Sequence, residues 1–464
     1  MPDHDRLIAL DLGSSFIKGA VLDLDALAIG HVERVAFPPP IPGLAPGLRE
    51  FDPSAIVSAT RALIERLAAR APDAAGIVMC GQLHGMVLAD ERGNARSTAI
   101  NWQDERALQP FPGGGGTYLD EIGRRLGADD RRCLGNEARP GVPLCYLFWL
   151  AQRGLLADES AIVASIPDFV VASLCGCPPT TEATHAYGHG ALDVETLVWH
   201  RGAIGKLGLA GVRWPRIVPQ GSVVGELAVG TRRLPVFAPV GDYQCSQAGA
   251  FLDEGELSVN VSTGSAVIQL ARGCEFGDFQ TRPWFDGRYL KTITHIPGGR
   301  ALNALVRLLG ELAEAQGHRL RDPWDYIVGE AERTGETDLA VDPAFYFGAM
   351  GERGSITHVR EENLTAGHLF RAAFAGMADN YARCALRIAP ARDWTRLVFS
   401  GGVALRIALL RRLVCDRLGQ AHRLAASEED TLLGLLVLAL SYRGLQPAVA
   451  DAIAQVRERG RAGA

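Results

Sequence analysis

The sequence predicts an α/β protein built from two similar domains, and three observations support that prediction. Segments typical of strands and of helices alternate along the chain, which favours helices layered on sheets. The 464 residues are too many for one ordinary hydrophobic core. A strand–turn–strand pattern near the N-terminus returns about halfway along the chain, as expected if each domain begins with the same hairpin.

The repeated pattern joins two apolar strands through a turn of small residues, over residues 7–18 and again over residues 257–268. Superposing Gly13 on Gly264 places Asp11 on Ser262, so only the first copy carries a carboxylate. Glycine and serine turns let backbone N–H groups approach a polyphosphate. Two such turns facing each other predict an ATP site, whereas a single copy would read as an ordinary β-turn. The expected phosphate-binding residues are Gly13, Ser14, Ser15, Thr263, Gly264 and Ser265.

The elements after the first hairpin follow from local signals. A proline-rich loop over residues 37–43 precedes a helix that begins after Asp52, its expected cap, and runs to about Arg70. A buried strand over residues 76–80 ends in the polar loop 81–85. These signals place polar side chains directly after a strand, where a binding site is expected.

The domain boundary is expected just after a short strand over residues 234–239. Near the other end, the apolar segment 431–440 is too short to span a membrane and predicts a buried helix. The last residues, from 457, are expected to fray. The predicted division is residues 1–239, residues 240–445 and a C-terminal tail over residues 446–464.

Composition narrows the class of protein. A net charge of -6 provides no basic face for nucleic acid or an anionic membrane. The first strand begins at Leu7, which leaves no room for a signal peptide. Nine cysteines without paired spacing predict reduced thiols, and Cys175 and Cys177 match no usual zinc or redox pattern. We therefore expect a cytoplasmic enzyme with a small-molecule substrate.

Asp242 is the candidate general base. It follows a strand and opens a run of small residues suited to a closely packed helix. A carboxylate at that place can take the proton of a sugar hydroxyl as the oxygen attacks phosphorus. The alternative at this position is a helix cap.

A second set of polar residues follows strands of the first half. Amide, imidazole and carboxylate groups recognise vicinal hydroxyls, and an indole can cover the apolar face of a sugar. A histidine such as His84 is often only structural, but its neighbours favour the sugar-binding interpretation. The expected substrate-binding residues are Gln82, His84, Trp102, Asp104 and Arg106.

Taken in order, these motifs resemble the FGGY carbohydrate kinases, and within them the sedoheptulokinases. The resemblance covers about residues 7 to 440. It rests on the motifs Asp11-Leu-Gly-Ser-Ser15, Gly81-Gln-Leu-His-Gly85, Trp102-Gln-Asp-Glu-Arg106, Pro167-Asp-Phe169, Gly241-Asp-Tyr-Gln244, Ser262-Thr-Gly-Ser265, Gly351-Glu-Arg353 and Gly401-Gly402.

The resemblance implies a two-domain actin-like ATPase (ribonuclease H-like) fold, with a mixed sheet in each domain and a cleft for ATP, Mg²⁺ and a sugar. It implies that Asp242 is the base, that Asp11 binds Mg²⁺ directly or through water, and that Gln244 contacts substrate. It also implies that Gly401 and Gly402 face adenosine. A homodimer is a further option that it leaves open.

The implied activity is phosphorylation of a terminal primary hydroxyl of a ketose, with sedoheptulose preferred. Xylulose and other pentuloses or polyols stay open as acceptors. A different class on the same fold is an ATPase that acts on a protein partner. The polar loops at residues 81–85 and 101–106 favour the sugar kinase.

Overall fold

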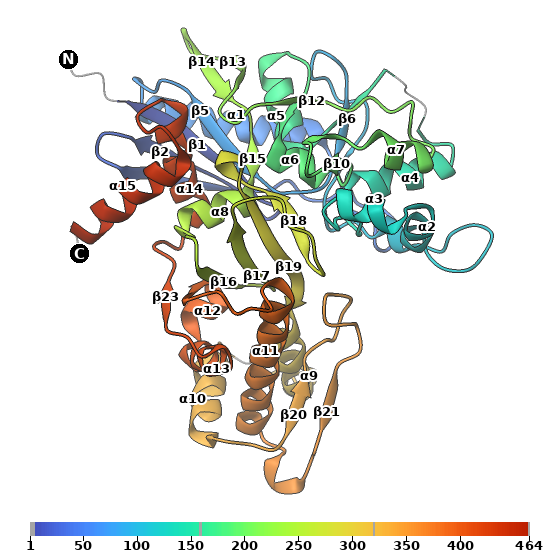
Figure 1. Ribbon diagram of the computed structural model, residues 1–464, viewed down its shortest axis with the longest axis vertical. Coiled ribbons are helices and arrows are strands. Elements are labelled where there is room, and N and C mark those ends of the chain that lie inside the picture. The colour runs from blue at the N-terminus through green and yellow to red at the C-terminus, as the bar shows by residue number, and fades with distance from the viewer. Residues whose placement is uncertain (1–4, 157–159, 319–320, 463–464) are drawn as a thin grey trace.

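The computed structural model describes residues 5–156, 160–318 and 321–462. Two lobes lie along the long axis of the molecule, and each contains a mixed β-sheet flanked by helices (Figure 1). The predicted α/β class and the pair of sheets are confirmed. Within the described ranges, no helix is long and apolar enough to cross a membrane.

The first sheet begins with the predicted hairpin. Its two strands are antiparallel, and β5 lies parallel to β1, so β1 and β5 end at the same edge of the sheet. The strand order is β13-β14-β5-β1-β2-β3, with β15 also paired to β5. The strands are β1 (Arg6–Leu12), β2 (Phe16–Asp23), β3 (Ala28–Ala36), β5 (Ile77–Gly81), β13 (Val223–Val229), β14 (Arg232–Phe237) and β15 (Val240–Gly241).

Helix α1 (Pro53–Arg70) covers this sheet and confirms the predicted start signal. Asp52 caps the helix, since its Oδ1 accepts a hydrogen bond from the backbone N–H of Ser54 at 2.8 Å. The loop over residues 37–43 contains no regular structure, as predicted.

The second sheet repeats the plan of the first. Its order is β18-β19-β17-β16-β22-β23, in which β16 and β17 form the second hairpin and β22 lies parallel to β16. The strands are β16 (Glu256–Val261), β17 (Gly264–Ala271), β18 (Gln280–Pro283), β19 (Tyr289–Pro297), β22 (Arg396–Ser400) and β23 (His422–Leu424).

The expected superposition of Gly13 on Gly264 is wrong. The first hairpin closes after the pair Leu12 and Ile17, and the second after the pair Val261 and Ser265. The second turn is therefore one residue shorter. The register matches Asp11 with Asn260, because each stands one residue before its closing pair. An amide thus occupies the second copy where the first has a carboxylate.

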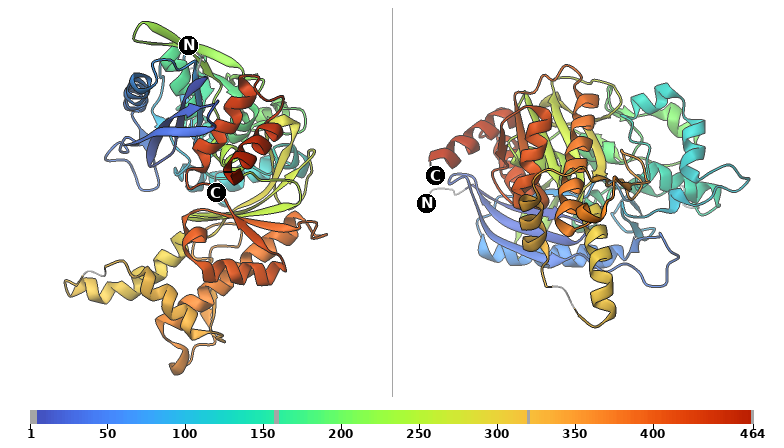
Figure 2. Two further views of the ribbon diagram at one scale, coloured as in Figure 1. Left: turned by 90° about the vertical axis from the view of Figure 1, so that its left-hand side faces the viewer. Right: turned by 90° about the horizontal axis from the view of Figure 1, so that it is seen from below.

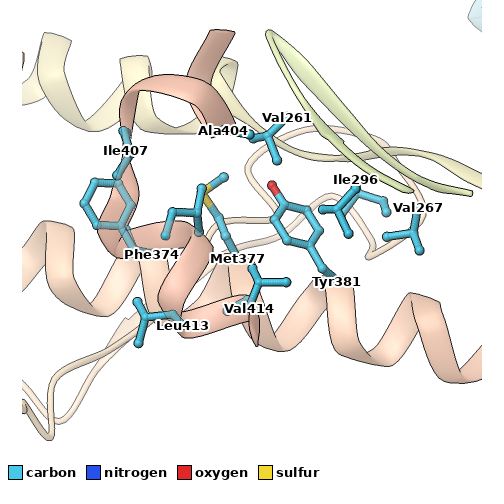
Figure 3. Close-up of a cluster of buried hydrophobic side chains, with 14 of the residues drawn as sticks. Val261, Val267, Ile296, Phe374, Met377, Tyr381, Ala404, Ile407, Leu413 and Val414 are labelled. Carbon is cyan, nitrogen blue, oxygen red and sulfur yellow. The ribbon is translucent and has the colours of Figure 1, made fainter. Parts of the chain in front are cut away.

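The core of the second lobe holds its hairpin in place. Helix α11 (Ala366–Ile388) contributes Phe374, Met377 and Tyr381 to one buried cluster that also contains Val261 and Val267 of the sheet (Figure 3). All five side chains are fully buried. The second turn therefore projects from a rigid support.

The C-terminal end of the chain returns to the first lobe (Figures 1 and 2). Helix α14 (Asp430–Tyr442) is the predicted buried helix, and it packs on β1, β5 and α8 (Asp242–Gly249). The fraying expected from residue 457 is wrong as far as residue 462, because helix α15 (Val449–Ala462) continues to that point and is anchored by buried Val449 and Ala452. Residues 463 and 464 lie outside the described residues. Segments of the second half thus complete the first lobe, and the boundary at residues 239 and 240 stays a prediction.

Two glycines allow α8 and α14 to touch. A Cβ atom at Gly434 would lie 2.0 Å from the carbonyl oxygen of Cys245, and one at Gly249 would lie 1.9 Å from that of Asp430. Such distances are far below van der Waals contact, so any larger residue must separate the helices.

Replacing Gly434 by alanine tests this contact. We expect Gly434→Ala to destabilise the protein by about 1–3 kcal/mol, because the methyl group overpacks the interface. The matched control is Gly205→Ala in helix α7 (Arg201–Lys206), where a Cβ meets no atom within 4 Å. That change should be neutral or stabilising, since alanine favours helices. Thermal melting of both variants measures the difference; equal melting points would contradict the proposed contact.

Candidate active site

A cavity of about 380 Å³ lies where the two sheets meet, and both hairpin turns reach it. Ser14 comes from the first turn and Gly264 from the second. The other expected site residues that line it are Gln82, His84, Trp102, Asp242, Thr263 and Ser265. The sequence therefore predicted a group of residues that the fold brings together from both lobes.

The second turn is enclosed by glycine backbone. A Cβ at Gly298 would lie 2.6 Å from Ser265 Oγ, and one at Gly401 would lie 2.5 Å from Ser262 Oγ. The N–H of Gly299 also donates to the carbonyl of Ser262 at 2.8 Å. Around Gly264 itself there is open space. Because glycine backbone packs closely behind the turn and open space lies around Gly264, the backbone of the turn is accessible to a ligand.

Ser265 lines the cavity, but its hydroxyl is engaged elsewhere. Its Oγ lies 2.9 Å from the hydroxyl of Tyr381 in the core, and the residue is 4 % exposed. In the first turn, Gly13 and Ser15 stand outside the lining of the cavity, and Ser15 is exposed. The turns thus present Ser14, Thr263 and backbone to the cavity.

Asp242 is the first residue of α8, directly after strand β15. Its position is fixed through its neighbour: the N–H of Gly241 donates to Thr184 Oγ1 at 2.9 Å, and that hydroxyl donates to Glu182 at 2.5 Å. Burial, together with the nearby charge of Asp11, raises the pKa of Asp242 to about 7. A carboxyl group with this pKa can accept a proton near neutral pH.

Asp11 lies behind the cavity wall and is 6 % exposed. Its Oδ2 accepts a hydrogen bond from Thr431 at 2.7 Å and lies 4.0 Å from Lys18 Nζ. Burial raises the pKa of Asp11 above its ordinary value, and the bond from Thr431 opposes that shift. Two carboxyl groups that each disfavour the charge of the other are suited to a cation between them.

The donor set fits Mg²⁺ only in part. Among the described residues there is no group of three or more His, Cys, Asp or Glu side chains that could hold a metal ion. Mg²⁺ commonly keeps several waters and uses one or two carboxylates together with substrate phosphates. Asp11 and Asp242 supply such a pair, so the site fits an ion that arrives with the nucleotide.

Gln82 and His84 occupy the sharp turn after β5. His84 has a φ of 69° and Gly85 one of 79°, so the chain reverses there and both side chains line the cavity. The amide oxygen and nitrogen of Gln82 are buried without a protein partner, as is His84 Nδ1. Buried polar atoms normally have partners. Gln82 and His84 thus line the cavity while keeping polar atoms that no protein group satisfies.

The four other expected substrate-binding residues differ in their placement. Trp102 is 39 % exposed and lines the cavity, consistent with a face for a sugar. Asp104 and Arg106 form a buried ion pair at 2.7 Å that does not line it. Gln244 is fully buried, and its Nε2 donates to the carbonyl of Pro283. The last three support the site from behind.

A second cavity of about 790 Å³ adjoins the first, since Thr263 lines both. Gly402 and Asn303 line it, and Gly401 lies beside it at a φ of 85°. Helix α9 (Gly299–Ala315) begins at its wall. The two cavities together offer one space large enough for a nucleotide and a small acceptor.

Sequence reasoning missed a charged cluster in the first cavity. Arg139 and Arg282 line it, and Glu137 lies between them with no exposed surface. Glu137 and Arg139 stand on a loop, whereas Arg282 comes from β18 of the other sheet. No local motif connects them, so only the pairing of the lobes reveals the cluster.

Comparisons with known proteins agree with this arrangement. The chain is 23% identical over 325 residues to a xylulose kinase of Staphylococcus xylosus, covering 65% of this chain and 64% of that one. It is 26% identical over 246 residues to a glycerol kinase of Chloroflexus aurantiacus, covering 48% and 46%. The chain thus spans less than two thirds of the length of either curated relative.

The fold is also shared with solved structures. The gluconate kinase of Lactobacillus acidophilus superposes with a TM-score of 0.82 at 18% identity, covering 99% of this chain and 96% of that one. The two-domain actin-like architecture expected from the sequence is therefore confirmed. The model of the N-terminal domain of the FGGY family of carbohydrate kinases matches residues 6–249, more than half of the sequence. The chain belongs to the FGGY family of carbohydrate kinases.

Proposed function

We propose that the protein transfers the γ-phosphoryl group of ATP to a terminal primary hydroxyl of a sugar or polyol. One observation supports this most directly: the turns of both hairpins and the Asp242 carboxyl group line one cavity together with the unpartnered amide of Gln82. Phosphate-binding backbone, a base and polar groups without protein partners are what such a transfer needs in one place.

In the proposed reaction, the triphosphate extends from the larger cavity past Thr263 towards Asp242. The acceptor oxygen forms a bond to the γ-phosphorus while the bond from that phosphorus to the bridging oxygen breaks, and ADP leaves. Asp242 takes the proton of the acceptor hydroxyl. Mg²⁺ held near Asp11 and Asp242 would neutralise phosphate charge. Backbone N–H groups of the two turns stabilise the charge of the transition state.

The proposal also concerns which sugar accepts the phosphoryl group. The resemblance of the motifs favours sedoheptulose, whereas a curated relative is a xylulose kinase. His84, Gln82 and Trp102 can contact hydroxyls and an apolar sugar face in either ketose. Our proposed division assigns acceptor binding to residues 1–239 and ATP binding to residues 240–445.

Release of ADP with and without an acceptor tests the proposed activity. We expect acceptor-dependent ADP release in a coupled assay with a panel of ketoses and polyols, and no appreciable hydrolysis without them. Asp242→Asn should lower kcat by about 10²–10⁴-fold, because the base is lost. In the natural protein, kcat/KM should rise with pH and reach half its maximum near pH 7, where Asp242 loses its proton. Sugar-independent hydrolysis would instead favour an ATPase with a protein partner.

The raised pKa of Asp242 also predicts a stability effect. The folded protein holds a proton on Asp242 up to about pH 7, whereas the unfolded chain releases it near the ordinary pKa of 3.8. Stability therefore falls as pH rises between those values. Asp242→Asn removes this loss, so the variant should melt higher than the natural protein at pH 8 and at the same temperature at pH 3. A difference that is independent of pH would contradict a buried titrating carboxyl group.

Asp11→Ala separates the metal role from the base. We expect the Mg²⁺ concentration for half-maximal rate to increase by about 10–100-fold, as when outer ligands of a metal are lost. The matched control is Asp278→Ala, because that exposed carboxylate pairs only with Arg387 at the surface. Undiminished turnover of Asp11→Ala at low Mg²⁺ would reject the metal role.

A further inference from the structure

The cavity contains two guanidinium groups that share one buried carboxylate. Glu137 Oε1 lies 2.7 Å from Arg139 Nη2, 3.4 Å from Arg282 Nη2 and 2.8 Å from His84 Nε2. The hydroxyl of Tyr187 donates to the other oxygen of Glu137. This carboxylate is therefore fully engaged and can balance the charge of only one guanidinium group.

Among the described residues, Glu137 is the only carboxylate within ion-pair distance of Arg139 or Arg282. Asp242 also lines the cavity, but it forms no ion pair with either guanidinium group. One guanidinium group is therefore left without an ion-paired partner.

Both guanidinium groups also retain unused hydrogen-bond donors. Arg139 Nε and Arg282 Nε are buried without a partner, and so is the amide of Gln82. Arg139 and Arg282 have side chains that are 16% and 2% exposed. A buried donor without a partner costs stability, and a charged one costs more. Arg139, Arg282 and Gln82 all line one cavity, so an acceptor-rich ligand bound there would lie next to all three residues.

The guanidinium groups are held rigidly in place. Arg139 Nη1 donates to Thr294 Oγ1 at 2.7 Å and lies 2.9 Å from His295 Nδ1, both on β19 of the second sheet. Arg282 lies over the ring of Tyr243, with its Cζ 4.5 Å from the ring centre. Rigid guanidinium groups match the planar oxygens of a carboxylate better than the single oxygen of a hydroxyl.

We propose that the acceptor is a sugar acid, whose carboxylate binds Arg139 and Arg282 while its terminal hydroxyl faces Asp242. This inference rests on the proposed kinase activity and revises its acceptor, since sedoheptulose and xylulose carry no charge. The same cationic pair could instead serve the γ-phosphate of ATP. In both cases the guanidinium groups would bind an anion. The experiment below distinguishes the carboxylate of a sugar acid from the γ-phosphate of ATP.

The test compares acceptors that differ in one group. Five-, six- and seven-carbon aldonates are assayed beside the alditol of the same skeleton, which has CH₂OH in place of the carboxylate, and beside the matching ketoses. We expect kcat/KM to favour at least one aldonate over its alditol by about 10-fold or more, as for a hydrogen-bonded charge. Titration calorimetry of Asp242→Asn without nucleotide should show the same preference in binding, independently of turnover.

Variants then locate the preference. Arg139→Gln and Arg282→Gln should each reduce the aldonate-to-alditol ratio by about 10–100-fold, and Arg139→Lys should keep part of it. Arg272→Gln is the matched control, because that side chain is 85% exposed and pairs with Glu254 at the surface. Melting curves establish whether each variant folds. If Arg139→Gln does not fold, Arg282→Gln alone provides the test.

The possible results are distinct. Equal or better use of alditols or ketoses would overturn the sugar-acid proposal while leaving the kinase intact. A rise in the KM for ATP with an unchanged acceptor ratio in the Arg282 variant would assign the cluster to the nucleotide and overturn it as well. Aldonate binding to Asp242→Asn without ADP release by the natural protein would instead reject the proposed kinase activity.

Discussion

The pairing of β1 and β15 with the same strand, β5, is the constraint on which the site depends. Gly81 of β5 pairs with Leu12 at the end of β1 and with Gly241 at the end of β15. Asp11 and Asp242 are the chain neighbours of these end residues, and they come close enough for the charge of Asp11 to raise the pKa of Asp242. Close packing of α8 on α14 at Gly249 and Gly434 then holds the helix that Asp242 begins. The proposed base and the proposed metal ligand are therefore fixed by strand pairing and packing, and not by any hydrogen bond between them.

Burying these carboxyl groups close together has an electrostatic cost. Burial, together with the charge of Asp11, raises the pKa of Asp242 and also raises that of Asp430 to about 6. Like charges buried together destabilise a fold unless a cation or protons relieve them. Thr431 and Lys18 offset part of the cost at Asp11. The arrangement therefore costs stability in the unliganded protein, and the proposed binding of Mg²⁺ and phosphate would relieve that cost.

Much of the fold could be predicted because local signals agreed with it. Asp52 and the proline after it fixed the start of α1, and both hairpins were visible as strand, turn and strand. The equivalence of Gly13 and Gly264 failed because the turn lengths differ, which composition does not reveal. The end of the chain was expected to fray since its sequence is polar, yet a few apolar residues at helical spacing hold α15 in place.

The site was predicted in part for a similar reason. Residues next to a turn or a strand end, such as Ser14, Gln82 and Asp242, could be recognised from their own neighbours, and they line the cavity. Asp104 and Arg106 also follow a strand and were expected in the site for the same reason. They form an ion pair with each other instead and do not line the cavity. The charged cluster around Glu137 combines segments of both lobes, and no pattern along the chain marks such a meeting.

The return of α14 and α15 to the first lobe has a consequence for how the protein is made. The face of β1 that α14 covers is apolar, with Leu7 and Ala9 fully buried against residues near the end of the chain. During synthesis that face stays uncovered until residues 430–456 have left the ribosome. Contacts this distant in sequence close slowly, and exposed apolar strands invite aggregation. The first lobe therefore completes its fold only after helices α14 and α15 have been synthesised and have packed against it.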